Sequence, residues 1–287
     1  MELALPITVY WDLALNPPLD ETLLRICDEI LEFHPLMLQL YDPSPVLSNG
    51  VRLILERFRG TPVAVSLTVP YVCIVSLAGT STAELGVREL LLACDNLESL
   101  DPLPLIPVFG LSFYVTRTNW HTLPDVVSFC RERGVNRLVL PLQRLYKGES
   151  PFLLDRSEQG RLERSLATVG GADGLRLTIH DPFLWRAFNP GTPFPQGGCQ
   201  AANTMIAISP DGGVFPCPSL PERIGAIGEM PLKEILISPA KKELRNRVVR
   251  YPAACDSCQE INICRGGCRG RSLVMHGSLE DIDDACR

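Results

Sequence analysis

Cys255-Asp-Ser-Cys-Gln-Glu-Ile-Asn-Ile-Cys-Arg-Gly-Gly-Cys268 is the stretch that decides how the last third of this chain folds. Its cysteines are spaced C-x2-C-x5-C-x3-C, and three more, Cys199, Cys217 and Cys286, lie before and after it. A deprotonated cysteine is a soft anionic ligand, and soft thiolates select zinc, copper(I) or iron–sulfur clusters. The two adjacent glycines leave room where the backbone must pass close to a bulky group. The last third is therefore predicted to bind metal.

Three kinds of site are compatible with seven cysteines in this region. Two structural zinc sites ordinarily need four cysteine or histidine ligands each, and His276 is the only histidine after residue 198. Iron–sulfur clusters tolerate an incomplete cysteine set, with a non-cysteine ligand on one iron. A disulfide framework needs an oxidising compartment, and the N-terminal sequence shows no export signal. The residues therefore favour clusters over zinc, and either metal site over disulfides.

The complete pattern resembles the SPASM domain, which follows the catalytic barrel in a subgroup of radical S-adenosylmethionine enzymes, many of them peptide maturases. The resemblance rests on the C-x12-G-x4-C spacing from Cys199 to Cys217, on Ile208-Ser-Pro-Asp-Gly-Gly-Val-Phe-Pro-Cys217 and on Cys264-Arg-Gly-Gly-Cys268. It implies two 4Fe–4S clusters. The ligands implied are Cys255, Cys258, Cys264 and Cys286 for one cluster, and Cys199, Cys217 and Cys268 for the other. The second set lacks a fourth cysteine, so one iron is expected to be open or to have another ligand.

Apolar runs alternate with helical patterns before residue 190, which predicts βα units around a parallel sheet. Strands are expected at 7–11, 36–40, 61–67, 103–115, 137–140 and 175–179. Helices are expected at 20–33, 49–58, 82–97, 122–133 and 156–169. We therefore predict an α/β fold with a partial (βα)6 TIM-like barrel over residues 1–190. A linker rich in glycine and proline, 191–198, then precedes a small cysteine-rich SPASM-like iron–sulfur domain, 199–287.

The expected barrel departs from the family in two loops. The family places a C-x3-C-x2-C loop after the first strand, and its cluster reduces S-adenosylmethionine; a Gly-Gly-Glu-Pro-like turn after the second strand binds the methionine amine. Here the loops read Trp11-Asp-Leu-Ala-Leu-Asn-Pro-Pro-Leu-Asp20 and Tyr41-Asp-Pro-Ser-Pro45. Asp12 and Asp20 offer hard oxygen ligands, which suit iron–sulfur assembly poorly. We therefore expect a degenerate barrel that does not use S-adenosylmethionine as a cofactor.

Other candidate residues favour structural roles. Single cysteines within apolar or helical runs are predicted to be buried thiols that behave as small hydrophobes; they are Cys27, Cys73, Cys94 and Cys130. His180 and Asp181 end the sixth expected strand and suit either a helix cap or acid–base chemistry. Trp11 is expected in the core or in the volume that the missing cluster would fill. The basic run 241–250 is interpreted as a solvated helix face.

Composition excludes two classes of partner. Hydrophobic residues make up 46% and charged residues 21% of the 287 positions, which is typical of a globular protein. No apolar run approaches the roughly 20 residues that span a bilayer, so no membrane span is expected. We expect a cytoplasmic location. The net charge of −6 belongs to residues 1–198, because residues 199–287 hold 11 basic and 11 acidic side chains. Without a basic tract, nucleic acid is not an expected partner.

Three hypotheses for function follow. The first is a non-catalytic iron–sulfur protein that transfers electrons or presents a peptide beside an intact radical S-adenosylmethionine maturase, with a precursor peptide as the shared partner. The second is an active peptide-modifying enzyme that uses the incomplete cluster at Cys199, Cys217 and Cys268. The third is a structural zinc protein.

Overall fold

The computed structural model describes residues 3, 5–17, 21–77, 79–98, 109–146, 148, 150–193 and 198–286. Its strands are β1 (Thr8–Asp12), β2 (Met37–Tyr41), β3 (Ala64–Pro70), β4 (Glu89–Cys94), β5 (Phe109–Phe113), β6 (Arg137–Leu140), β7 (Arg176–Ile179), β8 (Met205–Ile208), β9 (Gly213–Phe215) and β10 (Gly225–Ala226). Its α-helices are α1 (Glu21–Phe33), α2 (Asn49–Phe58), α3 (Thr82–Leu85), α4 (Leu123–Glu132), α5 (Arg156–Thr168), α6 (Pro182–Phe188), α7 (Leu232–Ile237), α8 (Pro239–Val248), α9 (Ile261–Cys264) and α10 (Arg269–His276).

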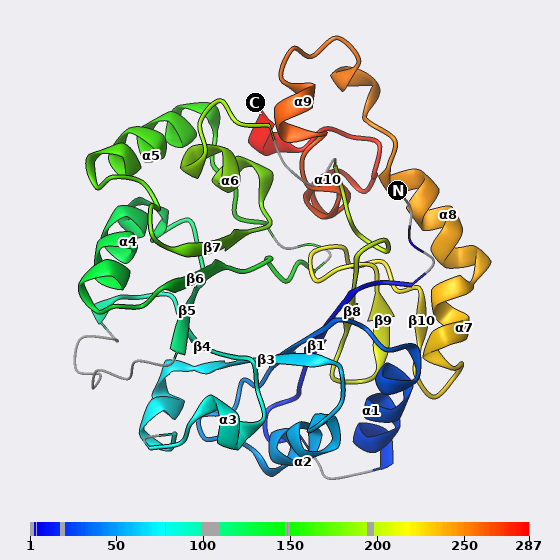
Figure 1. Ribbon diagram of the computed structural model, residues 1–287. Coiled ribbons are helices and arrows are strands. Elements are labelled where there is room, and N and C mark those ends of the chain that lie inside the picture. Colours follow the sequence, from blue (N-terminus) through cyan, green and yellow to red (C-terminus); the bar gives the residue numbers. More distant parts are fainter. Residues whose placement is uncertain are drawn as a thin grey trace.

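One curved sheet organises the molecule. Its strand order is β10-β9-β8-β1-β2-β3-β4-β5-β6-β7, and neighbouring strands from β8 through β1 to β7 are parallel. The helices from α1 to α5 lie on the outer side of the sheet, while α9, α10 and the C-terminus lie between α6 and α8 (Figure 1). The predicted α/β barrel-like architecture is confirmed.

The cysteine-rich part of the chain shares this sheet. Strand β8 pairs with β1 in parallel register, with Thr8 opposite Met205 and Trp11 opposite Ile208. Strands β9 and β10 then continue the sheet as antiparallel neighbours. Strands from both sides of residues 191–198 thus hydrogen-bond within one sheet. The division into a barrel, a linker and a second domain stays a prediction. Residues 194–197 of that linker lie outside the described residues.

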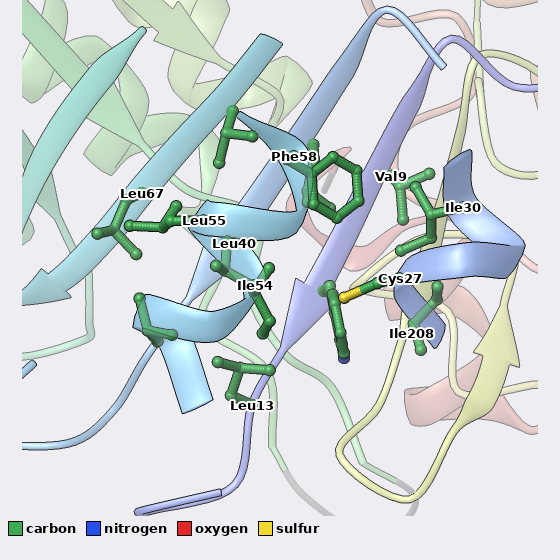
Figure 2. Packing of buried hydrophobic residues seen from close by; sticks show 14 of the residues in the cluster. Val9, Leu13, Cys27, Ile30, Leu40, Ile54, Leu55, Phe58, Leu67 and Ile208 are labelled. Carbon is green, nitrogen blue, oxygen red and sulfur yellow. The ribbon is translucent and has the colours of Figure 1, made fainter. Parts of the chain in front are cut away.

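Alternation along β1 separates the outer core from the barrel interior. Val9 and Trp11 are buried in a large hydrophobic cluster with α1 and α2, whereas Tyr10 and Asp12 face the other side. Figure 2 shows Cys27 within this cluster, beside Ile30 and Ile208. Trp11 is therefore a core residue. It does not fill the position of the missing cluster.

One predicted helix is wrong. Residues 82–97 were expected to form a single helix, but α3 ends after one turn at Gly86, whose φ of 72° is left-handed, and Glu89–Cys94 forms strand β4. An apolar run of five residues, Leu90 to Cys94, fits a buried strand or a buried helix equally well, and here both faces of the strand are covered. The described residues before 190 therefore contain seven strands where six were expected.

The remaining predicted elements lie close to their expected bounds. The strand expected at 103–115 is β5 over Phe109–Phe113, and residues 101–108 lie outside the described residues. Asp20, the first residue of the helix expected at 20–33, also lies outside them. The basic run 241–250 falls mostly in α8, but its interpretation as a solvated face is wrong for two residues, since Lys241 and Arg245 are buried.

Candidate metal centre

A cavity of about 490 Å³ lies between the C-terminal region and the strands β1, β7 and β8 of the sheet. Strand β1 contributes Thr8 and Tyr10 to its wall, and strand β7 contributes Leu177 to Ile179. Four of the predicted ligands also line it, namely Cys199, Cys217, Cys264 and Cys268. The fold therefore brings cysteines that are up to 69 positions apart in the sequence to one hollow.

Backbone contacts position the three cysteines of the incomplete set. The Arg245 guanidinium on α8 donates to the Cys199 carbonyl oxygen at 2.5 Å. Cys217 follows β9, and the backbone before it is held because the Ala202 N–H donates to the Pro216 carbonyl at 2.7 Å. Cys268 is the N-cap residue of α10, and its N–H donates to the Asp283 carboxylate at 2.6 Å.

A close backbone approach joins Cys268 to Cys217. Helix α10 passes so near the segment after Cys217 that a Cβ at Gly270 would lie 1.9 Å from the Ser219 carbonyl oxygen. Real Cβ atoms do not come that close to an oxygen, so only glycine allows this approach. Gly270 thus sets the separation between the two cysteines.

Electrostatics show that the three cysteines are neighbours. Burial raises the pKa of Cys217 well above its ordinary value, and the charges of Cys199 and Cys268 raise it further. Burial likewise raises the pKa of Cys268 to about 11. A metal binds the thiolate, so binding at this site must deprotonate thiols that would otherwise stay neutral.

The other four predicted ligands form a second group. Burial raises the pKa of Cys255, and the charges of Cys264, Cys286 and Cys258 raise it further. The Cys258 N–H donates to the Cys255 carbonyl at 3.1 Å, which closes the turn of the C-x2-C pair. Cys264 and Cys286 pack in one small cluster with Phe183 and Ala285. The role of all four cysteines as ligands stays a prediction.

Two arginines near the cysteines bear on whether this part of the chain fits an iron–sulfur cluster. Arg265 and Arg269 flank the Gly266-Gly267 pair, and each leaves a buried N–H donor, Nε of Arg265 and Nη2 of Arg269, without a partner in the described part of the chain. Iron–sulfur clusters carry negative charge and accept N–H hydrogen bonds at sulfur. Soft sulfur donors with orphaned cationic N–H groups beside them fit such a cluster.

Among the described residues, no three His, Cys, Asp or Glu side chains form a group that is arranged to hold one metal ion. Zinc and iron–sulfur clusters both bind cysteine thiolates, so the structural zinc alternative stays a prediction.

Buried ion pairs that sequence reasoning missed support the site. Arg271 on α10 is 2% exposed and donates to Asp283 at 2.7 Å and also to Asp181, the residue that caps α6. Asp283 accepts from both Arg271 and the Cys268 N–H, and the Cys286 N–H donates to its carbonyl at 2.8 Å. Asp283 thus links the two cysteine groups, through its carboxylate to the Cys268 N–H and through its backbone carbonyl to the Cys286 N–H, and Arg271 ties them to the barrel. No spacing pattern in the sequence indicated these partners.

The cap interpretation of Asp181 is confirmed. Its carboxylate accepts from the N–H groups of Phe183 and Leu184, both at 2.9 Å, at the start of α6. His180 instead lines the cavity, and its Nε2 lies 3.1 Å from the Tyr10 hydroxyl. Burial, with a smaller contribution from the Arg137 charge, lowers the pKa of His180 to about 4, so the ring is neutral near pH 7.

The four single cysteines lie in the core of the barrel. All are free and buried, Cys27 and Cys73 in one hydrophobic cluster and Cys94 and Cys130 in a second. Burial raises the pKa of Cys27 and Cys130 to about 12. Their prediction as small hydrophobic residues is confirmed.

An ion pair lies at the barrel mouth where the family's cluster loop would begin. Asp12 ends β1, and the Arg144 guanidinium donates to it through two N–H groups at 2.5 and 2.7 Å. Tyr41 and Tyr114 lie beside this pair, with ring centroids 6.4 Å apart. The cavity that remains inside the sheet measures about 60 Å³. The described residues here do not fit a cluster with S-adenosylmethionine bound to it.

Known proteins share both parts of this arrangement. Residues 199–259 match SPASM, an iron–sulfur cluster-binding domain. The PqqA peptide cyclase of Gluconobacter oxydans is 25% identical over 186 residues, which cover 61% of this chain and 50% of the cyclase. The PqqA peptide cyclase of Ruegeria pomeroyi is 25% identical over 185 residues, 61% of this chain and 48% of its own. This chain therefore spans about half the length of these curated relatives.

Solved structures show the same fold. Streptococcus suis SuiB bound to S-adenosylmethionine superposes with a TM-score of 0.69 at 17% identity, covering 100% of this chain and 78% of SuiB. SuiB bound to its precursor peptide SuiA gives 0.64 at 16% identity, covering 100% and 77%. The protein anSMEcpe with bound AdoMet gives 0.65 at 15% identity, covering 97% and 94%. The chain thus shares the fold of these proteins and carries a match to the SPASM iron–sulfur cluster-binding domain.

Among the described residues, no helix is both long enough and apolar enough to cross a bilayer.

Proposed function

We propose that this chain is an accessory iron–sulfur subunit that works beside an intact radical S-adenosylmethionine maturase on a precursor peptide. It would hold one 4Fe–4S cluster with Cys255, Cys258, Cys264 and Cys286. It would hold an incompletely ligated one with Cys199, Cys217 and Cys268. Such clusters supply one-electron transfer when bound.

The observation that carries this proposal is the Asp12–Arg144 pair. It lies at the end of β1, where related enzymes bind the cluster that reduces S-adenosylmethionine, and it offers carboxylate and guanidinium in place of thiolates. Guanidinium is no ligand, and carboxylate oxygen is too hard a ligand for iron–sulfur assembly. The barrel therefore keeps its architecture without the residues that cleave the cofactor.

A peptide is the proposed shared substrate. The relatives of this chain are named for peptides: two are PqqA peptide cyclases, and SuiB has been solved with the precursor peptide SuiA. A subunit that keeps the barrel and both cysteine groups retains surfaces on which such a peptide would be presented. A cytoplasmic location belongs to the same proposal, because thiolates persist in a reducing compartment.

One observation favours an active enzyme as the second candidate. The 490 Å³ cavity extends from the three-cysteine group to Tyr10, His180 and Trp185, so a ligand would have room beside the incompletely ligated iron. The enzyme would then modify a peptide at this cavity. It would do so away from the barrel mouth.

One assay separates the two candidates. The full chain is reconstituted anaerobically with iron and sulfide, then incubated with dithionite and S-adenosylmethionine, and 5′-deoxyadenosine is measured. We expect a brown protein that forms none. 5′-Deoxyadenosine that is lost in a Cys199→Ala, Cys217→Ala variant would support the active enzyme, and a colourless protein that binds zinc would overturn both.

A further inference from the structure

Arg269 occupies a singular position between the two cysteine groups. It follows Cys268 directly, is the first residue of α10 and is only 2% exposed. Its Nη1 donates to the carbonyls of Leu279 and Asp281 at 3.1 and 3.3 Å, which fixes the guanidinium plane. A carboxylate partner for it is absent from the hydrogen bonds and ion pairs of the described residues, in contrast to Arg271 with its two aspartates.

A second nitrogen of the Arg269 guanidinium, Nη2, has no acceptor among the described residues. It is buried, although a charged donor is costly to bury without an acceptor. The same nitrogen lies 3.4 Å from where a Cβ on Gly266 would stand, so it runs alongside the Cys264-Arg-Gly-Gly-Cys268 ligand loop. Arg269 also lines the cavity with Cys199, Cys217, Cys264 and Cys268.

The Arg269 guanidinium lies beside both groups. It lines one cavity with Cys199, Cys217 and Cys268 of the three-cysteine group and with Cys264 of the four-cysteine group. The Arg245 guanidinium instead binds the Cys199 carbonyl, in the three-cysteine group.

We propose that Arg269 is a shared positioning residue for both clusters: its Nη2–H donates to cluster sulfur, and its charge raises both reduction potentials. This inference rests on the proposed binding of two clusters. The physical reason is that reduction adds negative charge to a cluster, and a fixed nearby cation stabilises the reduced form.

The test is a redox titration of the reconstituted full chain, followed by electron paramagnetic resonance. Arg269→Gln keeps a polar side chain but removes the charge, and we expect both midpoint potentials to fall with iron content unchanged. Arg269→Lys keeps the charge, and both potentials should stay nearer the wild-type values. The matched control Arg245→Gln should lower the potential of the three-cysteine cluster alone.

A measurement on the wild-type chain keeps the inference testable even if the variants fail to assemble. Protein labelled with ¹⁵N in the arginine guanidinium is reduced, and hyperfine coupling from that nitrogen to a cluster is sought. Its presence supports the donation from Arg269, and its absence overturns it, as does an Arg269→Gln chain with clusters and unchanged potentials. A wild-type chain that binds no iron instead overturns the proposed function.

Discussion

Gly270 leaves no room for a methyl group, because its Cβ would lie 1.9 Å from the Ser219 carbonyl oxygen. We therefore predict that Gly270→Ala moves α10 away from the segment after Cys217 and separates Cys268 from Cys217. The three-cysteine cluster should be lost while the four-cysteine cluster remains, so that iron per chain falls by roughly half, one of two clusters. Iron analysis with electron paramagnetic resonance measures this. Gly160→Ala is the control, because its Cβ would meet only an arginine tip at 3.5 Å; equal iron in both variants would contradict the prediction.

The Asp12–Arg144 pair makes a second prediction at the scale of single residues. Both side chains are about three-quarters buried, at 23% and 25% exposed, so solvent screens the pair only in part. Arg144→Met leaves a carboxylate without its partner and should lower the free energy of unfolding by about 2 kcal/mol. Replacing both partners, Asp12→Leu with Arg144→Met, should recover most of that loss, since no lone charge remains. Urea unfolding followed by tryptophan fluorescence measures it, and a double variant less stable than the single one would refute the argument.

At the scale of single residues, the sequence predicted the candidate ligand cysteines but did not predict the buried ion pairs. The number and spacing of the seven cysteines indicate a metal site, and the resemblance to the SPASM domain implies their division into two groups. Arg271, Asp283 and Asp181 follow no such rule, because a buried ion pair joins positions that only the tertiary fold brings together. Arg245 was misread for the same reason. A cation on a helix face appears solvated until the carbonyl it binds, that of Cys199, is known.

Among the elements, hydrophobic periodicity predicted most helices. It failed where the sequence pattern fits a helix and a strand equally well. Leu90-Leu-Leu-Ala-Cys94 is apolar at every position, so neither a period of 3.6 nor a period of 2 distinguishes helix from strand. The choice is made by β3 and β5, which pair with β4 on either side. The left-handed Gly86 that ends α3 was the local signal that the helix stops early.

The N-terminus of α5 gives a prediction about pH. Glu158 belongs to a capping box with Asp155 and accepts from the Arg117 guanidinium at 2.6 Å. The Arg117 hydrogen bond lowers the pKa of Glu158 below its ordinary 4.5. A carboxyl whose pKa is lower in the folded state than in the unfolded state stabilises the folded protein. The full stabilisation is present when the pH is above the unfolded-state pKa, and it is lost as the pH falls through the folded-state pKa. We expect wild type to lose about 1 kcal/mol more than Glu158→Gln between pH 6 and pH 3.

The measurement compares thermal unfolding of the two proteins across that range. Glutamine retains the capping hydrogen bond but not the charge, so the helix N-terminus is kept while the titration is removed. Glu163→Gln, on the same helix, is the matched control and should follow wild type. Parallel pH curves for Glu158→Gln and wild type would show that the Arg117 contact contributes nothing.

Across the whole molecule, the apolar core is distributed unevenly. The largest hydrophobic cluster packs the outer face of the sheet and includes Ile206, Val214 and Leu236, well beyond the expected linker. The clusters around the cysteines are small, and one of them holds only Phe183, Cys264 and Ala285 as buried members. The fold class followed from the alternation of elements. That the C-terminal strands continue the barrel sheet did not follow, because β8 pairs with β1 nearly 200 residues away.

This distribution sharpens a prediction about Cys258→Ala. Metal binding at such a site contributes folding free energy on the order of 10 kcal/mol, and the segment 249–286 has few apolar contacts to replace it. We therefore expect loss of the four-cysteine cluster and rapid proteolysis after residue 248, while the sheet through β10 and α8 resists. Limited proteolysis with mass spectrometry locates the cuts. The variant Cys130→Ala is the control, because that thiol lies in the barrel core, and it should keep its iron.

The position of the first proteolytic cut distinguishes an independent domain at residues 199–287 from a region that shares the sheet of the barrel. If residues 199–287 were a domain independent of the barrel, loss of its metal would expose the chain from residue 199 onward. The sheet argues against this, because β8 is central between β1 and β9 and its Ile206 and Ile208 are buried in the barrel's own core. Cuts between 199 and 248 in Cys258→Ala would show that the metal stabilises the shared strands, and an uncut, iron-free protein would show that it stabilises neither region.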